Sequence, residues 1–225
     1  MIVASYLVGS LPFGLLLAKA VGGPDPRESG SGNVGATNVA RAVGKHWFPV
    51  ALFLDAAKGA IPVLFLAPIP FTDPEVFLPS RLAQYVHLDP VNHSQVFVAA
   101  ACGGAAVAGH VWSVFLRFRG GKGVATTAGA LAALAWLPLL GSVAVFGTVL
   151  LASGFVSLAS VAAAIAMPLL AWWDEQPNAV LWFSATVAVV IVIRHHTNLY
   201  RIVTGTEPGL HTSAPSAEPQ GETRV

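Results

Sequence analysis

Long apolar runs alternate with short polar segments along most of this chain. A helix that crosses a membrane needs roughly 20 apolar residues, and fewer when it lies inside a bundle. Pro138 and the Ser153-Gly154 pair interrupt the longest apolar run, because proline and glycine break helices. The pattern therefore predicts seven helical passes, at about residues 2–21, 48–66, 96–112, 124–137, 139–153, 156–173 and 179–193.

The fourth and fifth predicted passes are short for a full crossing. Merging residues 124–173 into one helix would leave five passes with the same ends on the same sides. That stretch is too long for one straight crossing, since each residue adds about 1.5 Å of helix. Seven passes are thus the better interpretation, and the predicted fold class is an all-α, polytopic integral membrane protein.

The composition supports a membrane protein. Of 225 residues, 55% are hydrophobic and only 10% are charged, with a mean hydropathy of +0.68. Soluble domains carry about 25% charged residues. The net charge of +1 gives no reason to expect nucleic acid as a partner, and a single cysteine, Cys102, allows no disulfide within the chain. The first apolar segment lacks a basic flank, so we expect a retained span rather than a cleaved signal peptide.

The basic residues predict how the chain is oriented. Alternating passes put nine of the 12 basic residues on one face and only Arg81 on the other, with Lys19 and Lys58 inside spans. An excess of lysine and arginine marks cytoplasmic loops. The N-terminus is therefore expected outside and the C-terminus in the cytoplasm. The nine are Arg27, Arg41, Lys45, Arg117, Arg119, Lys122, Arg194, Arg201 and Arg224.

The first polar segment on this face, residues 29–41, is rich in glycine, hydroxyl and amide groups and ends in Arg41. Glycines let a backbone wrap its N–H groups around an anion, and the arginine fork suits phosphate oxygens. A simpler interpretation is a glycine-rich turn in which Ser or Asn caps the next helix. Both interpretations stay open at the level of this segment.

The second segment is Arg119-Gly120-Gly121-Lys122-Gly123, directly before an apolar helix. Free N–H groups at a helix start favour anions, and Lys122 adds a full charge. The spacing is not that of a Walker A loop, and a plain positive anchor at the membrane surface is the alternative. His110, at the end of the preceding span, is expected to be a hydrogen-bonded helix-end histidine.

The third segment follows the last span and places Arg194, Asn198 and Arg201 on one helical face with His195 beside it. Arg201 and Glu207 are expected to pair. His195 is a candidate base or a donor to phosphate. Asp55 and Lys58, inside the second span, are expected to form an internal ion pair that ties the helix to the bundle.

Taken together, these strings resemble the bacterial acyl-phosphate:glycerol-3-phosphate acyltransferase family. The resemblance covers about 200 residues in the family's order and spacing. The strings that carry it are Ser-Gly-Asn-Val-Gly-Ala-Thr-Asn-Val-x-Arg at 31–41, Leu-Asp-x-x-Lys-Gly at 54–59, Gly-His and Phe-Leu-x-Phe-Arg-Gly-Gly-Lys-Gly-Val-Ala-Thr within 109–126, and Arg-His-x-x-Asn-x-x-Arg-x-x-x-Gly-Thr-Glu at 194–207.

The resemblance implies a membrane acyltransferase. A fatty acyl group would move from acyl phosphate to the sn-1 hydroxyl of glycerol 3-phosphate, giving lysophosphatidate and phosphate, the first acylation of phospholipid synthesis. It implies one transmembrane domain over residues 1–205 in the bacterial inner membrane, with the site facing the cytoplasm and with no cofactor or metal. Residues 206–225 are expected to be a mostly disordered tail. The implied partners are both substrates, membrane lipid, and the enzymes that make acyl phosphate and add the second acyl group.

The resemblance also implies roles for individual residues. The implied catalytic residues are Ser31, Arg41, Lys122, His195 and Asn198. The implied substrate-binding residues are Asn33, Thr37, Asn38, Gly120, Gly121, Gly123, Ser157, Arg201 and Glu207. Ser113 and Arg119 depart from the proline and lysine common in the family, but neither lies in the Gly-Gly-Lys-Gly core.

An acyl phosphate is already activated, so a covalent enzyme intermediate is not required. A substrate phosphate oxygen or His195 would accept the hydroxyl proton. The alternative function is a phosphate or organophosphate transporter, and a structural membrane subunit is a third. A transporter predicts polar residues at mid-membrane depth in several helices, whereas polar residues here concentrate on one face.

Overall fold

The computed structural model describes residues 1–28, 32–67 and 93–209. Ser31, most of the connection between the second and third predicted passes, and residues 210–225 lie outside the described residues. Predictions about them, including tail disorder and the catalytic role of Ser31, stay predictions.

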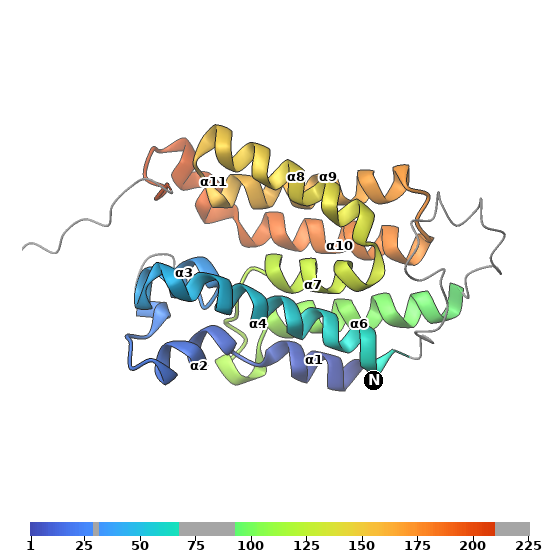
Figure 1. Ribbon diagram of the computed structural model, residues 1–225, viewed down its shortest axis with the longest axis horizontal. Helices are drawn as coiled ribbons and strands as arrows, with labels where there is room; N and C mark the ends of the chain where they lie inside the picture. The colour runs from blue at the N-terminus through green and yellow to red at the C-terminus, as the bar shows by residue number, and fades with distance from the viewer. Residues whose placement is uncertain (29–31, 68–92, 210–225) are drawn as a thin grey trace, which may run out of the picture.

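The described residues form helices joined by short loops (Figure 1). The helices are α1 (Ile2–Ser10), α2 (Phe13–Ala20), α3 (Ala36–Val43), α4 (Phe48–Ile61) with its π-helical extension η3 (Pro62–Leu66), α6 (His93–Val111), α7 (Val124–Leu134), α8 (Trp136–Ser153), α9 (Val156–Trp173), α10 (Asn178–Arg194) and α11 (His196–Val203). Single turns η1 (Pro26–Glu28), η2 (Lys45–Trp47) and η5 (Val114–Leu116) connect some of them. The predicted all-α class is confirmed for these residues.

Among the described residues, five segments are long and apolar enough to cross a membrane, and a sixth is counted if the bent pair α10 and α11 is one span. The bend between these two helices is 52°. Helix α7 is apolar but has only 11 residues. The structure thus supports five to six candidate spans, and the seventh pass rests on this short helix.

The first predicted pass is interrupted near its middle. Helix α1 ends at Ser10 and α2 begins at Phe13, because Pro12 has no N–H to continue the helix. The carbonyl of Leu11 instead accepts hydrogen bonds from the N–H of Phe13, at 3.0 Å, and from Lys58 Nζ, at 2.9 Å. A lysine from α4 therefore stabilises the break between α1 and α2.

The long run from Val124 breaks at Ala135, not at the predicted Pro138. Pro138 lies in the first turn of α8, where a missing N–H has no helical partner to lose. The predicted turn at Ser153-Gly154 is confirmed: α8 ends at Ser153, and Gly154 takes the left-handed conformation with φ of 74°. Two short connections thus separate α7, α8 and α9.

Helices α4 and α7 approach closely, and this approach brings the second and fourth predicted passes together. A Cβ atom on Gly59 would lie 1.9 Å from the carbonyl oxygen of Thr126, and one on Gly129 would lie 1.8 Å from that of Ala56. Glycine at both crossing points lets the two backbones touch, as is common between membrane helices. This packing fixes Asp55 on α4 relative to the loop that precedes α7.

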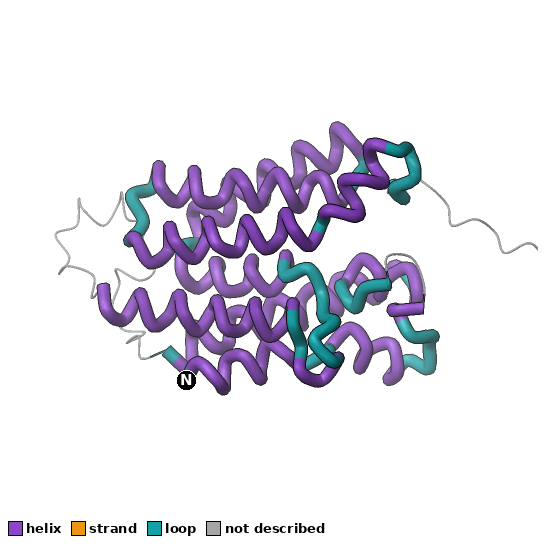
Figure 2. Tube along the Cα trace, turned by 180° about the vertical axis from the view of Figure 1, so that it is seen from behind, coloured by secondary structure: helices purple, strands orange, loops and turns teal. Residues whose placement is uncertain are grey.

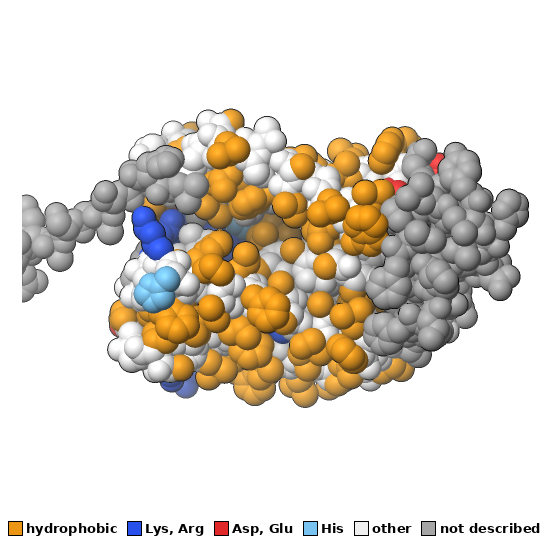
Figure 3. All heavy atoms as spheres, viewed as in Figure 1, with side chains coloured by type: hydrophobic (Ala, Val, Ile, Leu, Met, Phe, Trp, Pro, Cys, Tyr) orange, Lys and Arg blue, Asp and Glu red, His pale blue; other side chains and the backbone are white. Residues whose placement is uncertain are grey.

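The three polar segments lie at one end of the bundle. Helices α3 and α11 occupy that end together with the loop before α7, and the N-terminus lies at the other end (Figures 1 and 2). Apolar side chains cover much of the visible body, and most of the visible lysine and arginine side chains gather at the end that carries α3 and α11 (Figure 3). Several large apolar side chains are exposed on the helix surfaces: Phe53, Trp182 and Leu151 are 70%, 74% and 90% exposed.

Candidate active site

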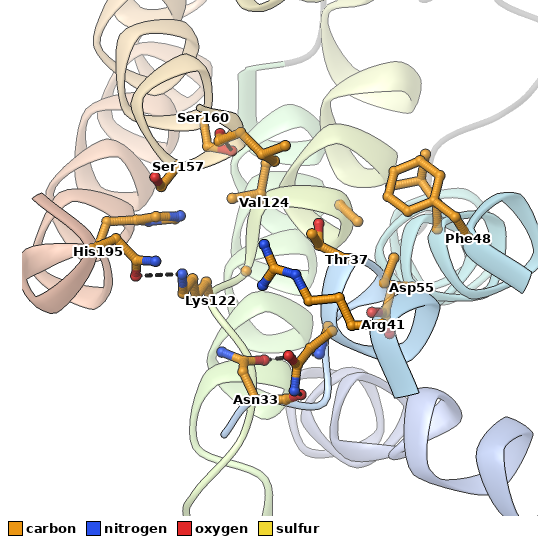
Figure 4. Close-up of a pocket in the computed structure, with 18 of the residues that line it drawn as sticks. Asn33, Thr37, Arg41, Phe48, Asp55, Lys122, Val124, Ser157, Ser160 and His195 are labelled. Atoms are coloured by element: carbon orange, nitrogen blue, oxygen red, sulfur yellow. Dashed lines mark hydrogen bonds between the residues drawn. The ribbon is translucent and has the colours of Figure 1, made fainter. Parts of the chain in front are cut away.

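A cavity of about 150 Å³ lies at this end of the bundle (Figure 4). It is lined by residues from α3 and the loop before it, from α4, α6, α8 and α9, from the start of α7 and the loop before it, and from the segments around α11. The polar lining comes from Asn33, Thr37, Asn38, Arg41, Asp55, His110, Lys122, Ser157, Ser160, His195, Asn198 and Glu207. Residues far apart in the sequence therefore share one cavity.

The first polar segment forms one wall of this cavity. The side-chain oxygen of Asn33 accepts a hydrogen bond from the N–H of Gly35 at 2.8 Å, which closes a turn directly before α3. Asn38 is 2% exposed and donates to the carbonyls of Asn33, at 2.8 Å, and of Pro26. Both amides thus shape the glycine-rich turn before α3 and line the cavity, but neither caps the helix, because its N-cap residue is Gly35 and no described side chain bonds its free N–H groups.

Thr37 and Arg41 lie four residues apart on α3, so both side chains share one helical face. Both line the cavity, and Arg41 extends toward its centre (Figure 4). Arg41 has no hydrogen-bond or ion-pair partner among the residues that the structure describes, and it is exposed. Its guanidinium is therefore available to an anionic ligand.

Lys122 faces Arg41 across the cavity (Figure 4) and donates to the side-chain oxygen of Asn198 at 2.6 Å. Burial lowers the pKa of its ammonium to about 8, and the negative charge of Glu207 opposes this effect only in part. Gly123, the N-cap residue of α7, adopts the left-handed conformation with φ of 88°, which favours glycine directly after the lysine. A ligand with negative charge would offset the free-energy cost of burying this cation.

Glu207 links three other site residues. Its Oε1 accepts from Ser157 Oγ at 2.8 Å and from Asn198 Nδ2 at 2.7 Å, and its Oε2 pairs with Arg201 Nε at 2.8 Å. Burial raises the pKa of Glu207, but the three hydrogen bonds together lower it by more than burial raises it. The pKa of Glu207 therefore lies below its usual range. The predicted Arg201–Glu207 pair is confirmed, and Arg201 lies outside the cavity lining with its charge already neutralised.

His195 is 2% exposed, in the turn between α10 and α11. Its Nδ1 lies 2.8 Å from the carbonyl oxygen of Ile191. A carbonyl oxygen can only accept, so Nδ1 carries the proton and Nε2 is the nitrogen left to meet a ligand. The ring can therefore accept a proton, or donate one to phosphate when it is charged.

Asp55 and His110 line the cavity without having been included in the predicted site. Asp55 and Lys58 form the predicted i,i+3 ion pair at 2.8 Å, and both are buried. His110 Nδ1 lies 3.7 Å from Asp55 Oδ1, too far for a hydrogen bond, and has no other partner among the described residues. The expectation of a hydrogen-bonded His110 is thus wrong. The sequence feature that indicated this cluster was the presence of two charged residues, Asp55 and Lys58, inside a predicted membrane span.

The cavity brings together most of the described residues that the sequence had singled out. Gly120, Gly121 and Arg201 are the described site residues that do not line it. Gly120 and Gly121 lie directly behind, with their N–H groups bonded to the carbonyls of Val111 and His110 at 3.1 and 2.9 Å. These N–H groups are therefore not free for a phosphate, contrary to what the glycine-rich string suggested.

Apolar side chains also line the cavity. Phe48 and Leu52 come from α4, Phe146 from α8, and Val124 and Val156 from the starts of α7 and α9. No cluster of three or more histidine, cysteine, aspartate or glutamate residues suited to a metal occurs in the described parts of the chain. The cavity thus combines a cationic and amide side with a hydrocarbon side.

Comparison with known proteins identifies relatives over nearly the whole length. The family model described as Glycerol-3-phosphate acyltransferase matches residues 1–205. A glycerol-3-phosphate acyltransferase from Syntrophotalea carbinolica is 38% identical over 207 residues, which cover 92% of this chain and 94% of the relative. One from Geotalea daltonii is 41% identical over 207 residues, with the same two coverages.

Two solved structures have the same fold. Both are crystal structures of an integral membrane glycerol 3-phosphate acyltransferase, and each alignment covers 92% of both chains. The glycerol 3-phosphate form has a TM-score of 0.76 at 36% identity, and the lysophosphatidic acid form has 0.73 at 34%. The chain belongs to the glycerol-3-phosphate acyltransferase family of integral membrane proteins.

Proposed function

We propose that this acyltransferase takes its acyl group from acyl phosphate and transfers it directly to the sn-1 hydroxyl of glycerol 3-phosphate. The observation that carries the proposal is that two cations, an Arg41 unpartnered among the described residues and a half-buried Lys122, face each other across one small cavity (Figure 4). The reaction needs two phosphate groups held close together, and two cations offset their mutual repulsion. The solved relatives are the glycerol 3-phosphate form and the lysophosphatidic acid form of an acyltransferase, an acceptor and a product that fit this reaction.

The lining suggests how the two substrates divide the cavity. Phosphate oxygens would contact Arg41, Lys122, Thr37 and, outside the described residues, Ser31. His195 and Asn198 would orient the glycerol phosphate, and Ser157 would lie near the acyl phosphate. The acyl chain would follow the apolar side formed by Phe48, Leu52 and Phe146, entering from the bilayer. Lysophosphatidate would then leave by the same side into the lipid.

The donor is tested by comparing three forms of the same acyl group. Purified protein is incubated with glycerol 3-phosphate and palmitoyl phosphate, palmitoyl-CoA or palmitoyl-acyl carrier protein, and lysophosphatidate is measured by mass spectrometry. Product from palmitoyl phosphate alone supports the proposal, and equal product from palmitoyl-CoA contradicts it. A transporter would form no product from any donor.

His195 provides the test of how the hydroxyl proton leaves. We propose that a phosphate oxygen of a substrate accepts this proton, and that His195 orients the acceptor. His195→Gln should then lower turnover by about 100-fold, as expected for a misplaced acceptor, yet keep the acidic limb of the pH–rate profile at the same pH. Disappearance of that limb would identify His195 as the general base.

The lowered pKa of Lys122 predicts an alkaline limb in the pH–rate profile. The lysine is cationic below its pKa of about 8 and loses its charge as the pH rises through that value. The ratio kcat/KM for glycerol 3-phosphate should therefore fall above about pH 8, because this ratio reports groups of the free enzyme. Arginine stays charged throughout this range. In Lys122→Arg the limb should move beyond pH 10, although the different shape of the side chain lowers activity. A limb that stays in place would assign it to another group.

The sides of the membrane are a further part of the proposal. Seven passes and the excess of basic residues on one face would put the site in the cytoplasm of a bacterium, with the N-terminus outside. This location would also place the enzyme beside those that make acyl phosphate and add the second acyl group. Residues 1–205 would form the whole transmembrane domain.

Cysteine labelling tests this orientation with little background, because Cys102 is 0% exposed. Thr206 lies beside the site, and Asn178 is the first residue of α10, at the end of that helix away from the site. Both positions are exposed, so each is replaced by cysteine in turn. In intact spheroplasts a membrane-impermeant maleimide should label only Asn178→Cys. After permeabilisation both should react. Labelling of Thr206→Cys in intact cells would reverse the proposed orientation.

A further inference from the structure

We propose that His110 is a positioning residue of this enzyme: its ring supports the glycine loop, residues 120–123, and thereby sets the position of Lys122. The proposal deepens the proposed function, because it assigns a role to the buried polar cluster beneath the site. The proposal is based on three buried side chains to which the proposed reaction assigns no role. These are Lys58, Asp55 and His110, which are 3%, 2% and 5% exposed.

The cluster connects two distant features of the fold. At one end, Lys58 donates to the carbonyl of Leu11 at the break between α1 and α2. In the middle, Asp55 pairs with Lys58 at 2.8 Å and lies 3.7 Å from His110 Nδ1. A buried ion pair gives little net stability, so its retention suggests a second role. Asp55 confines one edge of the His110 ring, since packing leaves a buried ring little freedom to move.

The other edge of the ring faces the glycine loop. A Cβ atom on Gly121 would lie 1.9 Å from His110 Nε2 and 2.6 Å from Cε1. Gly121 does not have a positive φ, so alanine is sterically excluded there by the ring and not by the backbone conformation. The backbone of Gly121 therefore lies directly on the imidazole, one residue before Lys122.

Gly120 provides a matched comparison within the same loop. Its Cβ would lie 1.9 Å from the backbone carbonyl oxygen of His110, and it also lacks a positive φ. Shortening the His110 side chain removes the obstacle at Gly121 and leaves the obstacle at Gly120 unchanged. The two glycines thus separate a role of the ring from a general need for glycine.

The test is a double-mutant cycle on glycerol 3-phosphate kinetics. Gly121→Ala should lower kcat/KM by about 100-fold, and His110→Ala should raise the KM for glycerol 3-phosphate about tenfold with a smaller change in kcat. The double variant should recover at least about tenfold over Gly121→Ala, since residues in contact couple by this much. His110→Ala should give no recovery to Gly120→Ala.

Several outcomes separate the possibilities. A double variant no more active than Gly121→Ala, or equal recovery of Gly120→Ala, would overturn the positioning role. The thermal midpoints in detergent should show the same order, so the test holds even where a variant is too inactive to assay. His110→Ser, measured in parallel, should reproduce the recovery. Wild-type protein that forms no lysophosphatidate from acyl phosphate would instead refute the proposed donor and leave the thermal cycle to decide the role of His110.

Discussion

Replacing Lys122 by methionine is expected to lower kcat/KM for glycerol 3-phosphate by about a thousandfold, near the upper range for losing one donor that stabilises developing charge. Methionine keeps most of the apolar stem and removes only the ammonium. The loss has two parts. The phosphate groups lose a cation in a buried setting, and Asn198 loses the donor that fixes its side-chain oxygen. The measurement is steady-state kinetics on protein that elutes as one species.

Lys19→Met is the matched control for this substitution. Lys19 is also cationic and near this end of the bundle, but it is exposed and lies outside the cavity lining. Its kcat/KM should change less than about twofold, because exposed charges contribute little through water. A Lys122→Met variant as active as Lys19→Met would remove the phosphate-binding role from Lys122.

Replacing Glu207 by alanine should have the second largest effect, a loss of about 100-fold in kcat/KM together with a lower thermal midpoint. One carboxylate holds Ser157, Asn198 and Arg201, so its removal leaves three polar groups without their acceptor. Each buried donor left unpaired costs about 1–3 kcal/mol. Asn198 would then no longer hold Lys122 in place, and the two substrates would lose their alignment.

Glutamine at position 207 distinguishes charge from shape. Its oxygen can still accept from Ser157 and Asn198, but its NH₂ group would face the Arg201 guanidinium, donor against donor. Glu207→Gln should therefore fall between wild type and Glu207→Ala. The exposed Glu28 supplies the control, and Glu28→Gln should leave both activity and thermal midpoint unchanged. Full activity of Glu207→Ala would show that α11 is held without this carboxylate.

The helical class, most of the apolar segments and most of the cavity lining could be predicted from the sequence. An apolar run of roughly 20 residues is long enough to predict a helix that crosses a membrane. The glycine, amide and cationic residues near Arg41, Lys122 and His195 are unusual in such a chain, and the charge distribution placed them on one side. The structure then joined them through contacts that local patterns also suggested, such as Arg201 with Glu207.

What the sequence could not predict depends on contacts between helices. The glycine loop looked like an anion-binding backbone, yet the N–H groups of Gly120 and Gly121 are used by carbonyls of α6. Asp55 is placed at the cavity by the close packing of α4 against α7, and His110 by the packing of the end of α6 against the glycine loop; no local pattern encodes either approach. The break at Pro12 was also not predicted, because the apolar run continues through it. The break is stabilised by Lys58, a distant residue that donates a hydrogen bond to the carbonyl of Leu11.

The central claim is that the acyl group passes directly from acyl phosphate to glycerol 3-phosphate within this cavity. The most direct measurement is phosphate release by the purified protein from palmitoyl phosphate, with and without glycerol 3-phosphate, alongside lysophosphatidate formed. Direct transfer predicts phosphate release only when the acceptor is present, in equal amount to lysophosphatidate. Release of phosphate without the acceptor, or release without matching lysophosphatidate, would contradict the account.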